Sequence, residues 1–306
     1  MTRRGLVLGI ILVVGILATA AAQQAGAPQG RGAAPQQPPL GTIEKVADGL
    51  YRIPGQGGAT AVYLAGNGVV LVDTKLANNG QGILSQVKTV TDKPITMIIN
   101  THTHGDHVGS NMFFPANVEI VTHENTKANM DKMPVYQDPA NKNGMPDRTY
   151  KDRLTLLSGN DSIDLYYFGP AHTNGDTFVV FRNRRVMHAG DVFANTAQPL
   201  IDVNNGGSGI AYGETIGKAA GAIKNVDTVI TGHTDVKKWQ DFVDYGEFNR
   251  LFLQHARASM KAGKTAEQAM ADLKLPDKFK GYTLTGGRGG PGGNFNVIYQ
   301  ELQKGQ

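Results

Sequence analysis

Three histidines and one aspartate lie within six residues of each other, in the segment Thr101-His102-Thr103-His104-Gly105-Asp106-His107. The segment follows the apolar run from Ile95 to Ile99, and a loop after a strand is a common place for the site of an α/β protein. Imidazole and carboxylate are the ligands that Zn²⁺ accepts when thiolate is missing. The spacing therefore predicts a metal centre. In it the small Gly105 lets the chain bend, so that His102 and His104 face one ion while Asp106 and His107 face a second.

Four further motifs occur in a fixed order around this segment. They are Val69-Val70-Leu71-Val72-Asp73, Gly169-Pro170-Ala171-His172, Ala189-Gly190-Asp191 and Thr231-Gly232-His233. Together with the His-x-His-x-Asp-His segment, they resemble the signature of the metallo-β-lactamase superfamily. The resemblance runs from Ile43 to His233. It implies an α/β fold, a four-layer αββα sandwich with the site at one edge between two sheets.

The same resemblance implies two zinc ions per chain. One zinc would take His102, His104 and His172, and the other would take Asp106, His107 and His233. Asp191 would bridge the two ions, which makes Asp106 and Asp191 the candidate catalytic carboxylates. A shared carboxylate and hydroxide would reduce the repulsion between two dications about 4 Å apart. Asp73 is expected to accept a hydrogen bond that fixes a ligand or its loop; a turn or helix-capping aspartate is the alternative.

The implied chemistry is hydrolysis, because zinc lowers the pKa of its water toward ~7 and so provides a hydroxide at neutral pH. The hydroxide would attack an ester, lactone, thioester or amide carbonyl of a small molecule. Zinc β-lactamases of the superfamily carry Cys or Ser near the bridging position, so Asp191 favours the glyoxalase-II-like and lactonase-like members. β-Lactamase activity at the same site remains an alternative, since the fold alone does not select a substrate.

Two other classes of protein stay open. One is a mononuclear iron sulfur dioxygenase of the same fold, which metal analysis would distinguish from a di-zinc hydrolase. The other is a non-catalytic binding protein, which the full set of ligands disfavours. Specificity is expected from loops over the site, namely Met133 to Asp147, Asn195 to Tyr212 and the glycine-rich tail Thr285 to Asn294.

Apolar patterning predicts alternating strands and helices, which is typical of an α/β architecture. The expected strands are Thr60 to Tyr63, Gly68 to Val72, Ile95 to Ile99, Val118 to Val121, Phe178 to Phe181 and Thr228 to Ile230, with Ile163, Leu165 and Tyr167 alternating in another. The expected helical faces are Ile83, Leu84, Val87 and Val90; Ile216, Ala219, Ala220 and Ile223; and Tyr245, Phe248 and Phe252. A last helix is predicted to open at Thr265 with a capping box to Gln268 and to end before Pro276. Phe295 to Leu302 is expected to return to the body.

Composition limits the partners of the chain. Its 306 residues include no cysteine, which excludes disulfides, thiolate ligands and a lipid-modified N-terminal cysteine. The formal net charge of +4 falls by two if Arg3 and Arg4 are removed with a signal peptide, which is too little to favour a polyanionic partner. We therefore expect a small-molecule substrate and no nucleic acid, with the oligomeric state left open.

The N-terminus predicts export. Arg3 and Arg4 precede an aliphatic run from Leu6 to Leu17, and small-residue motifs follow at Ala18-Thr19-Ala20 and Ala20-Ala21-Ala22. We predict a signal peptide over residues 1–22, a disordered Gln/Ala/Gly/Pro linker over 23–40 and one hydrolase domain over 41–306. The mature protein would be periplasmic or secreted, without stable membrane insertion. A retained anchor is the alternative, although a span needs about 20 apolar residues. The choice between the general secretory and twin-arginine routes stays open.

Three histidines outside the motifs receive plainer interpretations. His255 shares a helical face with Tyr245, Phe248 and Phe252, so it is predicted to be a packed core residue. A structural role is favoured for His188 over lining the site. His123 is placed in a loop after a strand rather than at the rim of the site.

Overall fold

The computed structural model describes residues 39–284 and 292–305, all of them within one compact unit, Gln37–Gln306. The predicted signal peptide (1–22) and all but the end of the predicted linker (23–40) lie outside the described residues, as does most of the glycine-rich tail. These assignments therefore stay predictions.

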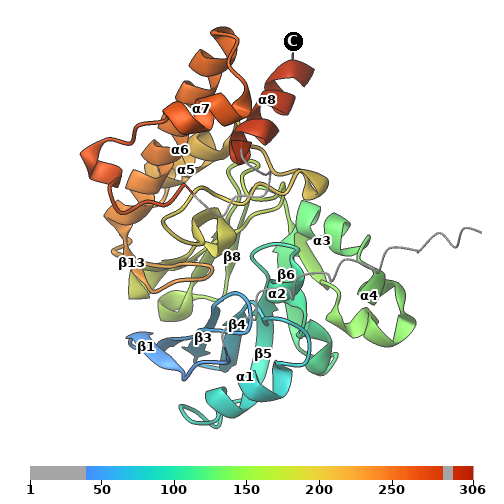
Figure 1. Cartoon of the computed structure of the whole chain (residues 1–306). Helices are drawn as coiled ribbons and strands as arrows, with labels where there is room; N and C mark the ends of the chain where they lie inside the picture. Colours follow the sequence, from blue (N-terminus) through green and yellow to red (C-terminus); the bar gives the residue numbers. More distant parts are fainter. Residues whose placement is uncertain (1–38, 285–291, 306) are drawn as a thin grey trace, which may run out of the picture. The chain divides into compact units, whose positions relative to one another are not determined.

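Two mixed β-sheets form the centre of this unit (Figure 1). The first sheet follows chain order and consists of β1 (Glu44–Ala47), β2 (Leu50–Ile53), β3 (Thr60–Ala65), β4 (Gly68–Val72), β5 (Ile95–Ile99), β6 (Glu119–His123) and β7 (Arg148–Tyr150). It is antiparallel from β1 to β4 and parallel from β4 to β7. The second sheet has the order β13-β12-β11-β10-β9-β8, and its members are β8 (Arg153–Leu156), β9 (Ile163–Tyr166), β10 (Phe178–Phe181), β11 (Val186–His188), β12 (Thr228–Ile230) and β13 (Lys237–Lys238). Only β11 and β12 are parallel in it.

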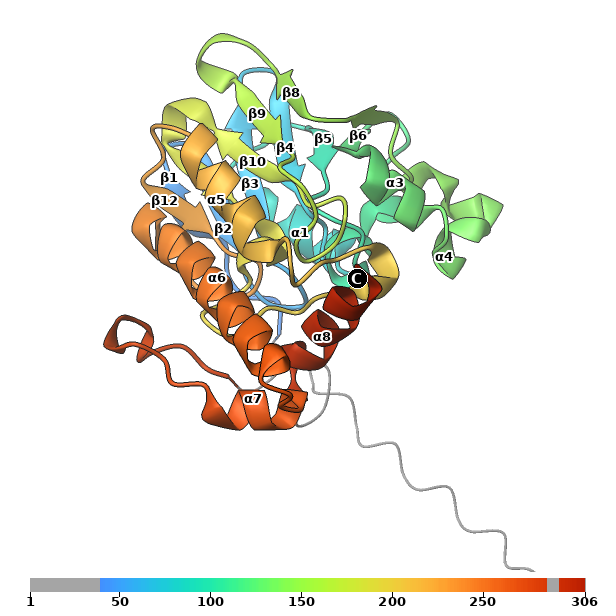
Figure 2. The same ribbon diagram turned by 90° about the horizontal axis from the view of Figure 1, so that it is seen from above.

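The helices of the described residues are α1 (Gly80–Val87), α2 (Gly105–Val108), α3 (Glu124–Met130), α4 (Pro134–Gln137), α5 (Tyr212–Ala222), α6 (Trp239–Lys261), α7 (Ala266–Asp272) and α8 (Asn294–Lys304). α1 and α3 pack on the first sheet and α5 and α6 on the second, while α7 and α8 pack against α6 (Figures 1 and 2). Short 3₁₀ turns connect several of these elements, including one at Gly190–Phe193 and one at Val203–Asn205.

The layering follows from strands that are apolar on both sides. In β4, Val70 and Val72 belong to the core between the sheets, whereas Val69 and Leu71 belong to the core beneath α1. Neighbouring side chains of a strand point to opposite faces of the sheet. A strand that is apolar at every position must therefore be packed against other elements on both faces. β10 alternates in the same way, between the inter-sheet core and a third core under α5 and α6. The predicted αββα order of layers is confirmed.

Most predicted elements are present with the expected residues, and the capping box between Thr265 and Gln268 is confirmed at the start of α7. Five residues were wrongly placed at element ends. Val118 precedes β6, Tyr167 follows β9, Val90 and Ile223 lie beyond the ends of α1 and α5, and Asn294, assigned to the glycine-rich loop, is the first residue of α8. Among the residues that the structure describes, no helix is both long and apolar enough to cross a membrane.

Candidate metal centre

The candidate ligands lie at the carboxyl ends of strands from both sheets. Asp73 directly follows β4 and the His102–His107 segment follows β5, while Asp191 and His233 come three residues after β11 and β12, respectively. Because β4 and β5 are parallel, as are β11 and β12, the strands of each pair end at the same edge of their sheet. The two edges meet, so residues more than one hundred positions apart share one site.

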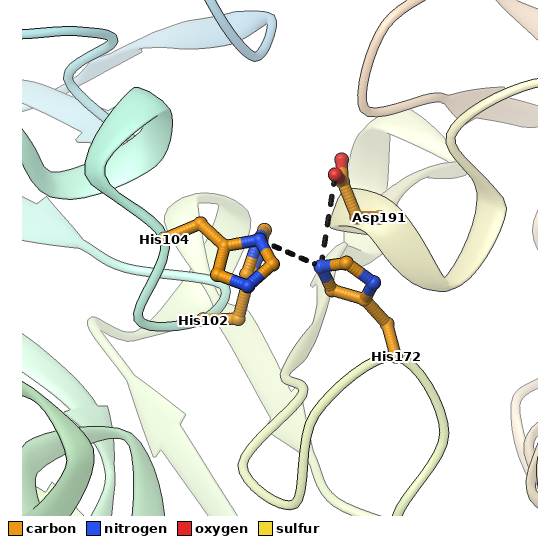
Figure 3. A group of neighbouring side chains, drawn as sticks. All are labelled: His102, His104, His172 and Asp191. Atoms are coloured by element: carbon orange, nitrogen blue, oxygen red, sulfur yellow. Dashed lines mark hydrogen bonds and ion pairs between the residues drawn. The ribbon is translucent and has the colours of Figure 1, made fainter. Parts of the chain in front are cut away.

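The first group of side chains consists of His102, His104, His172 and Asp191 (Figure 3). One nitrogen or oxygen from each lies within 4.8 Å of those of the others. Nδ1 of His104 is 3.0 Å from Nε2 of His172, which in turn is 3.7 Å from Oδ2 of Asp191. His102 and His172 are fully buried, and His104 is partly exposed.

The second group consists of Asp106, His107 and His233. One nitrogen or oxygen from each of these side chains lies within 4.8 Å of those of the other two. Oδ2 of Asp106 lies 3.4 Å from Nε2 of His233 and 3.9 Å from Nε2 of His107. Asp106 and His107 are the second and third residues of the short helix α2.

Asp191 stands between the two groups. Its Oδ1 is 3.3 Å from Nε2 of His107, and its Oδ2 is 3.1 Å from Nε2 of His233 and 3.7 Å from Nε2 of His172. One carboxylate therefore faces histidines of both groups. All seven residues singled out from the sequence are brought together, in the two sets expected of them.

Three buried atoms of this cluster make no hydrogen bond with any described residue, namely Nε2 of His102, Nε2 of His107 and Oδ1 of Asp191. Leaving one buried polar atom unpaired costs about 1–3 kcal/mol, so three that converge on one place need a common partner. A cation supplies it, because each atom presents a lone pair. The donor set of imidazole nitrogen and carboxylate oxygen, without sulfur, suits zinc and related divalent metals. The residues present thus fit a metal pair.

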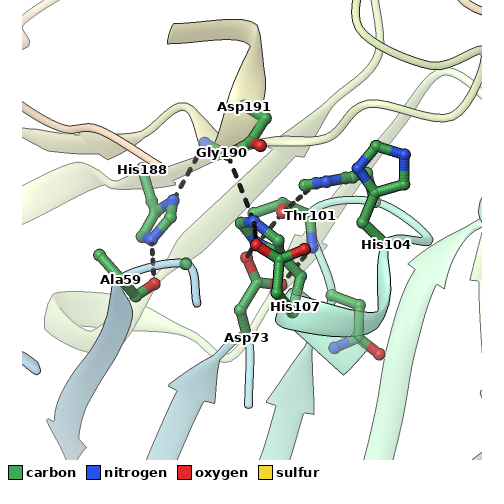
Figure 4. Close-up of polar contacts among 12 residues, drawn as sticks. Ala59, Asp73, Thr101, His104, His107, His188, Gly190 and Asp191 are labelled. Carbon is green, nitrogen blue, oxygen red and sulfur yellow. Dashed lines mark hydrogen bonds and ion pairs between the residues drawn. The ribbon is translucent and has the colours of Figure 1, made fainter. Parts of the chain in front are cut away.

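Asp73 fixes which nitrogen of two histidines faces the site (Figure 4). Its Oδ2 accepts from Nδ1 of His107 at 2.7 Å and from the Thr101 hydroxyl at 2.7 Å. Since that hydroxyl has already donated its proton, it accepts from Nδ1 of His102 at 2.9 Å. In both rings Nδ1 then carries the proton, and Nε2 keeps its lone pair toward the site. Asp73 also accepts from the Thr101 amide at 2.8 Å and caps no helix, which agrees with the hydrogen-bonding interpretation of this residue.

Burial and charge act differently on the site histidines. Burial lowers the pKa of His172 to about 4 and holds that of His102 well below its usual value, which favours neutral imidazoles. Burial would also lower the pKa of His107, but the carboxylates of Asp191 and Asp73 on either side hold it well above the usual value. Without a metal, Nε2 of His107 therefore takes a proton toward Asp191, which a bound cation would displace to use the lone pair. Likewise burial opposes the charge on Asp191, yet His107 and His233 hold the pKa of this carboxyl well below its ordinary range.

Glycines allow the backbone to approach the ligands. A Cβ on Gly58 would lie 2.1 Å from Cε1 of His107, and one on Gly232 would lie 1.9 Å from Oδ1 of Asp191. Gly105 is different, because a Cβ there meets nothing within 4 Å and its backbone is helical at the start of α2. The interpretation that Gly105 is needed for the bend was therefore wrong, since an L-residue fits its conformation.

Two cavities open beside the ligands and share Asp191, Leu200 and His233. One has a volume of about 430 Å³ and is lined mainly by Ala194–Leu200, with Tyr245 and Thr283. The other has a volume of about 620 Å³ and includes Leu76, His104, Asp106, Asp202, Asn204 and Asn205. The segment Asn195 to Tyr212 thus lines the site as predicted. Met133 to Asp147 does not line either cavity; it folds into α4 and a 3₁₀ turn, and Sδ of Met133 accepts from the Thr103 hydroxyl at 3.6 Å.

Residues 54–240 match the sequence model of the metallo-beta-lactamase superfamily. The chain belongs to this family. Members of the family are mostly hydrolytic enzymes, and this chain carries His and Asp groups that could hold metal. It is 29% identical over 174 residues to "2,4-dinitroanisole O-demethylase subunit alpha" of Nocardioides sp. (strain JS1661), covering 54% of this chain and 48% of that protein. It is 31% identical over 136 residues to the uncharacterized protein YobT of Bacillus subtilis (strain 168), covering 42% and 58%. The chain thus spans about half the length of these curated relatives.

Solved structures of the superfamily share the fold. The stereoselective inverting sec-alkylsulfatase Pisa1 from Pseudomonas sp. superposes with a TM-score of 0.72 at 15% identity, over 85% of this chain and 50% of that one. A metallo-beta-lactamase from Pontibacter korlensis superposes with a TM-score of 0.57 at 17% identity, over 68% and 99%. At these identities the likeness shows the fold alone.

The site also has polar supports that the sequence motifs did not reveal. Lys75 is fully buried, and its Nζ donates to the carbonyls of Ile53, Gly55 and Gly58 at 2.7–2.8 Å. Burial lowers the pKa of Lys75 to about 7, and below that pH the ammonium form can donate one N–H to each of the three carbonyls. Lys75 therefore ties down the loop that carries Gly58 against His107.

Arg52 holds the loop that carries His233. This buried side chain donates to the carbonyl of Thr234 at 2.8 Å and to Oδ1 of Asp235 at 2.8 Å. Asp202 is a third residue that sequence reasoning missed, and its Oδ2 lies 2.7 Å from Nε2 of His104. No local motif marks these residues, because their partners lie in distant segments.

The three other histidines are structural, but two were wrongly placed. His188 is fully buried and links two segments beside the site, donating to the Ala59 carbonyl at 3.0 Å and accepting from the Gly190 amide at 3.1 Å (Figure 4). His123 is not in a loop. It ends β6, is buried and caps α3 by accepting from the Asn125 amide at 3.2 Å. His255 is half-buried rather than in the core, and it donates to the Ala269 carbonyl of α7 at 2.9 Å.

Proposed function

We propose that the chain is an exported hydrolase that uses two zinc ions to cleave an ester, lactone, thioester or amide carbonyl of a small, uncharged molecule. The observation that carries the proposal is Asp191, whose two oxygens face histidines of two separate ligand groups. One ion would be held by His102, His104 and His172, the other by Asp106, His107 and His233, with Asp191 common to both. When bound, the zinc pair would polarise the substrate carbonyl and supply a hydroxide nucleophile at neutral pH.

The protein groups would orient and shield that reaction. Asp191, with a side chain only 8% exposed, would bind between the ions and reduce their repulsion. Asp106 is 23% exposed and lines the larger cavity, so a substrate can approach its carboxylate. Oδ2 of Asp106 faces Nε2 of His233 and of His107, so we assign to this atom the holding of the second ion and to Oδ1 the relay of a proton. The buried Asp73 would keep both Nε2 lone pairs of His102 and His107 directed at the ions.

The lining of the two cavities supports an uncharged substrate. Among the described residues, neither cavity includes a lysine or an arginine, and the smaller one presents amide, hydroxyl and apolar groups from Ala194–Leu200, Tyr245 and Thr283. A phosphodiester or sulfate would need its charge balanced by cationic side chains in addition to the ions. A lactone or thioester needs no such partner.

Cleavage of an aryl ether is a second candidate function. It is favoured by the 29% identity with the protein named as a subunit of a 2,4-dinitroanisole O-demethylase, over about half of each chain. Such a reaction also expels an oxygen leaving group, which a cation can stabilise.

A substrate screen with metal analysis tests the proposal. The protein without residues 1–22 is loaded with zinc and assayed against lactones, thioesters, nitrocefin, phosphodiesters, alkyl sulfates and aryl methyl ethers. We expect two zinc ions per chain and turnover of a lactone or thioester that is lost on chelation and restored by zinc. Turnover of nitrocefin would instead favour the β-lactamase alternative, and one iron per chain in the protein as purified, with oxygen uptake, would favour the dioxygenase. Full activity in the presence of chelator would overturn the two-zinc proposal.

A further inference from the structure

The segment from Leu200 to Asn205 is in contact with two histidines of the first ligand group. The carbonyl of Leu200 accepts from Nδ1 of His172 at 2.7 Å, and Oδ2 of Asp202 lies 2.7 Å from Nε2 of His104. In both rings the contact uses the nitrogen that faces away from the site, which leaves Nε2 of His172 and Nδ1 of His104 directed at each other, 3.0 Å apart. The segment therefore determines how both rings are turned.

Asp202 is itself held in place. Its amide donates to the His172 carbonyl at 2.9 Å, and its carboxylate accepts from the Asn204 amide at 3.1 Å and from Nδ2 of Asn205 at 2.6 Å. The side chain of Asp202 is only 12% exposed. A carboxylate restrained by its own loop in this way has little freedom to leave His104.

The same segment faces the substrate space. Leu200, Asp202, Asn204 and Asn205 all line the larger cavity, and Leu200 also lines the smaller one. Asn205 additionally fixes the segment to the backbone that follows His172, because its carbonyl accepts from the Asn174 amide at 2.9 Å. One short stretch of chain is thus both a wall of the substrate cavities and the support of two ligands.

We propose that Asp202 is a positioning residue for the first metal, acting through His104, and that the Leu200–Asn205 segment sets the affinity of that site. This inference rests on the proposed two-zinc function. A carboxylate that accepts from the remote N–H of a ligating imidazole fixes the ring and increases its basicity, and loss of such a partner typically costs 10–100-fold in metal affinity. The second group lacks contact with Asp202, so its affinity is not expected to change.

The test compares zinc binding by wild type and the Asp202→Asn variant, using competition with a chromophoric chelator. We expect one of two sites to weaken by about 10–100-fold and the other to keep its affinity. The cobalt-substituted proteins are compared by visible absorption, where a turned His104 ring changes the ligand-field bands of one ion. Asp227→Asn is the matched control, because Asp227 is 61% exposed and pairs with Arg185 away from the site.

A second variant separates positioning from loop stability. Asn205→Ala removes the 2.6 Å hydrogen bond to Oδ2 of Asp202 but leaves the carboxylate beside His104. We expect it to retain most of the zinc affinity, and Asp202→Glu to recover part of what Asp202→Asn loses. The thermal midpoints of the metal-free proteins are measured as well, because both variants lose a hydrogen bond of the loop and loop stability is thereby compared separately from zinc affinity.

The outcomes distinguish this inference from the proposed function. If the wild-type protein binds no zinc, or binds it without effect on hydrolysis, the proposed function fails. If the wild type binds two ions and Asp202→Asn binds both with unchanged affinity and unchanged cobalt spectrum, the positioning role of Asp202 is refuted while the function stands. Equal losses in Asp202→Asn and Asn205→Ala would also refute it, because the carboxylate would then have no effect of its own.

Discussion

Replacing Gly58 with alanine should displace a ligand of the second metal without changing any ligand. The added Cβ would lie 2.1 Å from Cε1, 2.5 Å from Nε2 and 2.6 Å from Nδ1 of His107. Because carbon atoms pack at about 3.5 Å, the ring and the new methyl must separate by roughly 1.4 Å. Neither Gly58 nor His107 can move easily, because both are held by hydrogen bonds. Gly58 is bound through its amide to the Asp106 carbonyl at 2.9 Å and through its carbonyl to Lys75 at 2.8 Å, while His107 is held by Asp73 at 2.7 Å.

A displacement of this size has a calculable effect. Misplacing a reacting group by about 1 Å can cost on the order of 100-fold in rate, so we expect kcat of Gly58→Ala to fall by about that factor. Zinc content should fall toward one ion per chain, because Nε2 of His107 no longer faces the second group. The assay is kcat at saturating zinc on the substrate found by the screen, together with metal analysis of the purified variant.

Gly221→Ala provides the matched control. Gly221 lies in α5, and a Cβ there meets nothing within 4 Å. In a helix this change stabilises by roughly 0.5–1 kcal/mol, so its kcat and zinc content should equal those of the wild type. If Gly58→Ala also behaves like the wild type in both measurements, the ring of His107 is not needed where the structure has it, and the reasoning from close packing is refuted.

Three further expectations can be checked separately. Asp191→Asn should lower kcat by about 100-fold or more at saturating zinc, with little change in folding, because it removes the negative charge between two dications; a wild-type rate would exclude the bridging role. The pKa of Lys75 is about 7 in the folded chain and 10.5 ordinarily. Between pH 7 and 10.5 protonation of Lys75 therefore favours the unfolded chain. The unfolding free energy of the wild type should therefore rise with pH between 7 and 10.5, by up to about 1.4 kcal/mol per unit more than that of Lys75→Met, and parallel pH profiles would contradict it. N-terminal sequencing of the exported protein should begin at Ala21 or Gln23, whereas an intact Met1 on a membrane-bound product would indicate an anchor.

The part of the site that could be predicted from the sequence is the part whose ligands lie close together in the chain. His102, His104, Asp106 and His107 lie within six residues after a strand of five apolar residues, so both the ligands and the element that positions them are visible together. The other three ligands, His172, Asp191 and His233, were found through their motifs and not through spacing.

The residues that sequence reasoning missed act over long distances in the chain. Asp202 and His104 are 98 positions apart, and Arg52 and Thr234 are 182 apart. Nothing in the local pattern distinguishes Lys75 from a surface lysine, although it is fully buried. Its role appears only when β2 and β4 lie in one sheet and bring three carbonyls around one ammonium. β11 was missed for a different reason, because His188 ends its apolar run after two residues, whereas the equally short β12 is β-branched throughout.

The distance between the two ligand groups is set by how the sheets pack, because each group takes ligands from both of them. His107 follows β5 of the first sheet, whereas its neighbour Asp191 follows β11 of the second. Hydrogen bonds close to the ligands join the sheets, from the Ala59 amide to the Gly232 carbonyl at 2.7 Å and from His188 to the Ala59 carbonyl at 3.0 Å. A relative shift of the sheets would therefore break these bonds before it separated Asp191 from His107. The two hydrogen bonds of the Ala59 backbone thus fix how the sheets lie against each other beside the site. They thereby hold the two ligand groups at the spacing that a shared carboxylate requires.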